Sequence, residues 1–72
     1  MKDRDIFARN LTRLRNERDL TQEELGFRAG LDRSTISNLE RRIHSPTFKN
    51  ILKLAAALEV KAEELITSSE KK

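Results

Sequence analysis

Residues 21–40, TQEELGFRAGLDRSTISNLE, contain the start and stop signals of two short helices separated by a tight turn. Thr21 followed by Glu24 forms the S/T-x-x-E pattern of a capping box, and Leu20 and Leu25 flank that cap as a hydrophobic staple. Gly30 can turn the chain in a left-handed conformation without steric cost, so we expect the first helix to end there. Asp32 is expected to cap the second helix through its side-chain oxygen. The segment predicts a helix–turn–helix unit.

The second helix of this unit has two chemically different faces. Ile36, Leu39 and Ile43 fall on one side, whereas the other side carries short hydrogen-bonding groups framed by arginines. Arg and Asn can bind guanine and adenine bidentately in the major groove of DNA, and serine pairs with either base. We therefore predict that the base-contacting residues are Arg33, Ser34, Thr35, Ser37 and Asn38. The alternative is that these residues are only solvated surface side chains.

The chain resembles the phage-repressor (Xre or Cro/C1) family of helix-turn-helix proteins over roughly residues 5–66. The resemblance is carried by LTQEELGFRAGLDRSTISNLER and by the following HSPTFKNILKLAAALEVKAEELI. The stretch LDR-x-x-IS-x-x-ER also resembles the controller proteins of restriction–modification systems, a small autoregulatory branch of that family. The resemblance implies a lambda-repressor-like fold and sequence-specific binding to double-stranded DNA.

Phosphate contacts are expected on either side of the second helix. Gln22 lies at a helix start, where free N–H groups and the helix dipole favour an anion, and the resemblance implies that it also braces the second helix. Arg42 stands where many family members have glycine, so we expect a helix one residue longer or a different turn. The predicted phosphate-contacting residues are Thr21, Gln22, Arg41, Arg42, His44, Ser45 and Thr47.

Arg15 and Glu40 lie at the edges of the apolar stripes of their helices. In phage repressors, a pair at the matching positions forms a partly buried salt bridge between the first and third helices. Such a pair fixes the relative orientation of two helices more surely than it increases the free energy of unfolding. We hypothesise that this structural ion pair sets the angle of the second helix of the unit.

The remaining sequence predicts an all-α domain of five helices. Asp3 or Asp5 is expected to cap a first helix that runs to about Asp19. Ser45 is expected to cap the fourth helix, with Pro46 at its first position. The residues expected to line that helix are Phe48, Ile51, Leu52, Ala55 and Leu58, and a short last helix is expected over 62–66.

A single helix-turn-helix domain is expected over residues 1–72, with a folded core at about 3–66 and a frayed tail at 67–72. Within the core, Gly26 is expected to allow close approach of the second and third helices. Phe27 points away from Leu25 and Ala29, and we expect it to pack against the first helix or the region joining the third and fourth.

Composition excludes several classes of protein. The 72 residues contain no cysteine, so neither disulfides nor thiolate metal sites can support the fold. The charged N-terminal residues do not form a signal peptide, and the longest apolar run, residues 54–58, is too short to span a bilayer. We expect a cytoplasmic protein without cofactor or metal. The net charge of +3 comes from 15 basic and 12 acidic residues, which is weak support for nucleic-acid binding.

No enzyme motif is recognisable, because the chain has one histidine, no glycine-rich phosphate loop and no metal-binding spacing. The predicted function is a homodimeric transcriptional regulator on a near-palindromic operator, with autoregulation and an RNA polymerase contact left open. Its expected dimer interface consists of Val60, Leu65 and Ile66. The alternatives are a protein-interaction module and an antitoxin with the same fold.

Overall fold

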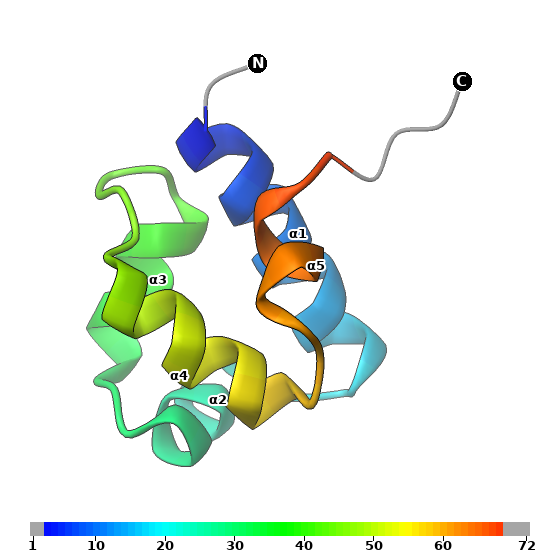
Figure 1. Cartoon of the computed structure of the whole chain (residues 1–72). Helices are drawn as coiled ribbons and strands as arrows, with labels where there is room; N and C mark the ends of the chain where they lie inside the picture. The colour runs from blue at the N-terminus through cyan, green and yellow to red at the C-terminus, as the bar shows by residue number, and fades with distance from the viewer. Residues whose placement is uncertain (1–2, 69–72) are drawn as a thin grey trace.

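The computed structural model describes residues 3–68 and consists of five helices around one core (Figure 1). Their bounds are Asp3–Glu17 (α1), Gln22–Ala29 (α2), Arg33–Glu40 (α3), Phe48–Leu58 (α4) and Ala62–Ile66 (α5). Helix α2 packs against α3 and α4, and α1 packs against α3 and α5. The prediction of an all-α fold is confirmed. Within residues 3–68, no helix has both the length and the apolar character needed to cross a membrane.

The core is built from one apolar stripe on each helix. Phe7, Leu11 and Leu14 of α1 are buried, as the sequence predicts. Helix α2 contributes Leu25, and α3 contributes Ile36. The other buried core side chains are Leu20, Ala29, Leu39, Leu54, Ala55, Leu58 and Leu65. Burying this apolar surface is the main force that brings the five helices together.

Four helices end in the same hydrogen-bonded turn, although the sequence signals only one of them. In each turn one residue has a positive φ, and the next residue donates its N–H to a carbonyl five positions earlier. This is the Schellman pattern that glycine favours. The positive-φ residues are Asp19 (φ 55°), Gly30 (φ 72°), Arg42 (φ 66°) and Glu59 (φ 60°). Each is followed by an apolar residue, Leu20, Leu31, Ile43 or Val60.

Several predicted helix boundaries are wrong. Helix α1 ends at Glu17 rather than at Asp19, because Asp19 takes the left-handed position of the turn. Asp3 and Asp5 lie within the first turn of α1, where they face the positive end of the dipole instead of capping it. Asp32 occupies the cap position of α3, but its side chain makes no capping hydrogen bond.

Helix α4 starts later than the sequence predicts. Thr47, not Ser45, is the cap, and its Oγ1 accepts the N–H of Asn50 at 3.0 Å. Pro46 therefore precedes the cap and α4 begins at Phe48. Leu54 is fully buried, whereas Phe48 and Leu52, which the sequence predicts on the core-facing side, are exposed.

Two further predictions about apolar residues fail. Leu65 is completely buried inside the single chain, which removes it from the predicted dimer interface. Phe27 is 87% exposed because Leu25 and Ala29 take the core-facing positions of α2. Val60 is half-buried against the core, whereas Ile66 remains 50% exposed.

Asn10 is the one buried polar residue among those described, and the sequence reading missed it. Its Nδ2 donates to the carbonyl oxygens of Leu65 at 2.9 Å and Thr67 at 2.8 Å. These bonds attach the end of α5 to α1, which lie side by side in Figure 1. Thr67 is therefore held in place rather than frayed, and its hydroxyl also donates to the Glu63 carbonyl. Residues 69–72 of the predicted tail lie outside the described residues.

Candidate nucleic-acid interface

The turn between α2 and α3 sets the position of the outward face of α3. Gly30 has the left-handed conformation expected of it, and Leu31 donates its N–H to the Gly26 carbonyl at 2.8 Å. A Cβ atom on Gly26 would lie 2.6 Å from the Leu31 backbone oxygen. Only glycine allows this close approach of α2 to the start of α3, as the sequence predicts.

Helix α3 buries Ile36 and Leu39 and turns its polar residues outward. Arg33 and Ser34 in its first turn are exposed. The other predicted base-contacting residues, Thr35, Ser37 and Asn38, are half-buried at the same helix. Ile43, predicted to share the apolar face, lies beyond the end of α3 and is 45% exposed. The five predicted residues thus belong to one short helix anchored by two apolar side chains.

A hydrogen-bonded network holds the C-terminal end of α3 in place. Arg15 of α1 donates from Nε to Glu40 Oε2 at 2.7 Å and from Nη2 to Glu40 Oε1 at 3.0 Å. This bidentate pair is the ion pair expected from the sequence, and both side chains are largely buried. The hydrogen bond to Glu40, reinforced by its charge and opposed by desolvation, raises the pKa of Arg15 above its ordinary value. The network extends further, because Arg15 Nη1 also donates to the Leu20 carbonyl at 2.7 Å.

Gln22 joins the same network. Its Nε2 donates to Glu40 Oε1 at 2.9 Å, which connects the first residue of α2 to the last residue of α3. The capping box before it is complete: Glu24 N donates to Thr21 Oγ1 at 3.0 Å, and Thr21 N donates to Glu24 Oε1 at 2.8 Å. One carboxylate, that of Glu40, therefore ties α3 to both α1 and α2.

The connection after α3 keeps the glycine-type turn although arginine occupies it. Helix α3 does not extend, because Arg42 adopts a positive φ and Ile43 donates its N–H to the Asn38 carbonyl at 2.9 Å. The Arg42 side chain points back to α1, where Nε lies 3.1 Å from Asp5 Oδ1. Arg41 remains exposed at the end of α3.

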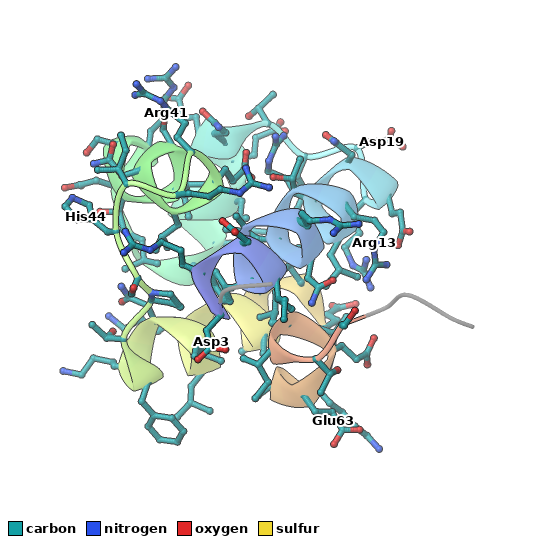
Figure 2. All side chains as sticks on the ribbon, turned by 90° about the horizontal axis from the view of Figure 1, so that it is seen from above. Asp3, Arg13, Asp19, Arg41, His44 and Glu63 are labelled. Carbon is teal, nitrogen blue, oxygen red and sulfur yellow. The ribbon has the colours of Figure 1, made fainter. Side chains whose placement is uncertain are left out.

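His44, Ser45 and Thr47 are exposed on this connection. They line a hollow of about 360 Å³ together with Thr35 and Asn38 of α3. Asn50 of α4 lines it too and was missed by the sequence reading. Figure 2 shows Arg41 and His44 on the side of the molecule opposite Glu63 of α5. This hollow therefore brings two of the predicted base-contacting residues beside three of the predicted phosphate-contacting residues.

The comparison with protein families agrees with this geometry. Residues 11–65 match the model of a family described as helix-turn-helix. The chain belongs to the helix-turn-helix family. A relative from Sinorhizobium fredii, described as an uncharacterized HTH-type transcriptional regulator, is 40% identical over 70 residues, covering 97% of this chain and 91% of the relative.

Two restriction–modification proteins are also similar. The control protein C.SmaI of Serratia marcescens is 34% identical over 67 residues, covering 93% of this chain and 80% of the relative. The crystal structure of the controller protein C.AhdI from Aeromonas hydrophila is 42% identical with a TM-score of 0.85, covering 89% of this chain and 97% of that one. The predicted resemblance to controller proteins is confirmed, and this helix-turn-helix chain is a DNA-binding regulator of transcription by family.

Proposed function

We propose that the protein is a cytoplasmic, sequence-specific regulator that binds a near-palindromic operator as a homodimer. The observation that carries this proposal is the outward face of α3. Its arginine, serines, threonine and asparagine are held on a helix whose last residue, Glu40, is fixed by Arg15 and Gln22. A helix positioned so firmly presents its side chains to the base edges with little loss of conformational entropy on binding.

Base contacts and phosphate contacts would have different roles in DNA binding. Arg33 would bind guanine O6 and N7, and Asn38 would bind adenine N6 and N7. Arg41 and the exposed residues of the α3–α4 connection would bind phosphates, which set the position of α3 in the groove without reading sequence. On the other side of α3, Thr21 and Gln22 at the start of α2 would bind a phosphate, which the positive end of the helix dipole favours.

Self-association would use the apolar side chains that a single chain leaves exposed. Phe48 and Leu52 lie four residues apart on α4 and are 74% and 47% exposed. Ile51 of α4 and Ile66 of α5 line one hollow of about 440 Å³, so apolar side chains of the two helices lie near each other. We call Phe48, Ile51, Leu52 and Ile66 the α4–α5 surface. A second copy would cover this surface around a two-fold axis, with α3 of each copy in successive major grooves.

The similarity to controller proteins supports autoregulation, so the DNA upstream of this protein's own gene is the first operator to test. Fluorescence anisotropy would compare that labelled duplex with a scrambled duplex at two salt concentrations. Tight binding to the upstream duplex alone is expected. Transcription with purified RNA polymerase on the same DNA would then show whether bound protein blocks the polymerase or contacts it productively.

Arg33→Ala provides the residue-level test. Because it removes a predicted guanine contact, the variant should lose about 1–3 kcal/mol of specific binding and relax preference at one position. Arg28→Ala is the matched control, since Arg28 is an exposed arginine on α2 outside the predicted contacts. Equal losses for Arg33→Ala on the upstream and scrambled duplexes would move Arg33 to the phosphate-contacting class.

A further inference from the structure

An arginine-rich groove lies between α1 and the end of α3. It has a volume of about 600 Å³. Arg9 and Arg13 come from α1, while Arg41 and Arg42 come from the turn that ends α3. Figure 2 shows Arg13 beside α1 and Arg41 projecting from the α3 end. The remaining lining residues are Ala8, Asn10, Thr12, Gln22 and Glu40. We call this hollow the arginine groove.

The residues that line the arginine groove carry a net positive charge, because four of them are arginines and one is a glutamate. Glu40 is its one acidic lining residue, and that carboxylate already receives both hydrogen bonds from Arg15, which is not part of the lining. Arg13 pairs with Glu17 at 3.4 Å and Arg42 pairs with Asp5 at 3.1 Å. Both pairs are substantially exposed, and exposed pairs of this kind contribute about 0–1 kcal/mol, so either arginine can exchange its partner for a stronger anion.

The chemistry of the arginine groove fits phosphate. The planar guanidinium fork matches the geometry of phosphate oxygens, and arginines from α1 and from the turn after α3 line this one hollow. Three of the residues that line it, Gln22, Arg41 and Arg42, are predicted phosphate contacts. The groove is therefore continuous with the surface expected to follow the DNA backbone, beyond the bases that α3 reads.

We propose that the arginine groove binds a backbone phosphate of the DNA flanking the bases read by α3. This inference rests on the proposed function and adds Arg9 and Arg13 of α1 to its phosphate contacts. Neither residue belongs to the helix-turn-helix unit, so α1 becomes part of the interface rather than only a support for it.

The test measures the salt dependence of DNA binding for Arg9→Gln, Arg13→Gln and the double variant. Losing one phosphate contact should reduce the slope of log K against log salt by about 0.9, which corresponds to about fivefold weaker binding at about 0.15 M salt. The loss should be the same on the upstream and scrambled duplexes, because phosphates carry no sequence information. Arg28→Gln is the matched control and should leave the slope unchanged. Thermal unfolding would establish that all variants fold.

A second experiment distinguishes binding of a DNA phosphate in the groove from binding of a free phosphate compound. Inorganic tripolyphosphate would be titrated into the DNA-free protein and followed by NMR of the arginine Nε–H groups. Unchanged slopes in all three variants would overturn the proposal, and tripolyphosphate binding lost in those variants would then assign the groove to a free anion. If the variants had reduced salt slopes but the protein did not prefer the upstream duplex, the groove would still be a phosphate site. The proposal that the upstream DNA is a specific operator would then be contradicted.

Discussion

Single residues decide how α2 and α3 meet. Gly26 brings the backbone of α2 against the Leu31 carbonyl, and Gly30 reverses the chain in the left-handed conformation. The two glycines act differently, because Gly26 supplies space and Gly30 supplies a backbone angle. Nothing lies within 4 Å of a Cβ placed on Gly30, so only its φ of 72° favours glycine there.

Gly26→Ala tests whether the close approach of α2 and α3 requires glycine at this position. Its Cβ would meet a backbone oxygen at 2.6 Å, so α2 and α3 must move apart. We expect the free energy of unfolding to fall by about 1–3 kcal/mol, the usual cost of overpacking. Urea unfolding would measure this change. A gain of about 0.5–1 kcal/mol, as helix propensity alone predicts for glycine to alanine, would contradict the close approach.

The sequence predicts the Gly30 turn but not the three related turns, and the reason lies at the residue scale. Asp19, Arg42 and Glu59 all have positive φ, a conformation in which non-glycine residues are unusual. Their signal is the apolar residue that follows each of them, because its contact with the core completes the turn. For Arg42 the expected alternatives were a longer helix or another turn, whereas the structure keeps the glycine-type turn.

At the scale of elements, α3 is held by one carboxylate that joins three helices. Glu40 accepts from Arg15 of α1 and from Gln22 of α2. The sequence predicted the ion pair but not its extension to the Leu20 carbonyl, because that bond depends on the turn at Asp19. The start of α4 was mispredicted for a related reason. Both Ser45 and Thr47 can cap a helix, and the choice between them depends on packing against the core.

Charge reversal tests whether this network orients α3. Arg15→Glu alone places two carboxylates together and Glu40→Arg alone places two guanidinium groups together, so each should cost about 3 kcal/mol of folding stability and weaken operator binding. The double variant should regain about half of both losses. Recovery should remain incomplete because a glutamate at position 15 cannot donate to the Leu20 carbonyl. Stability regained without any operator affinity would contradict the orienting role.

At the scale of the whole molecule, the surface around α3 and the α4–α5 surface have different characters. The first is lined by polar and basic side chains, whereas the second exposes the apolar side chains of Phe48, Leu52 and Ile66. The sequence predicted a dimer interface near the end of the chain but could not separate core from surface. Leu65 and Ile66 are adjacent, yet one is fully buried and the other is half exposed.

Replacing Phe48 and Leu52 together with serine should disrupt the proposed dimer. Both side chains are exposed, so the monomer should keep its fold, while the dimer dissociation constant should rise by about tenfold or more. Sedimentation velocity would measure the change, and operator binding should weaken with it. Phe27→Ser is the matched control, because Phe27 is also an exposed aromatic residue but lies on α2. An unchanged dissociation constant in the double variant would place the interface elsewhere.

The attachment of α5 to α1 joins residues that are synthesised early to residues that are synthesised late. A ribosome completes α1, α2 and α3 before it synthesises Leu65 and Thr67, whose carbonyls the Asn10 amide requires. Until then the core lacks Leu65, and Asn10 has neither of these two acceptors. Polypeptides interrupted before α5 would therefore carry α3, the helix proposed to contact bases, on an incomplete core.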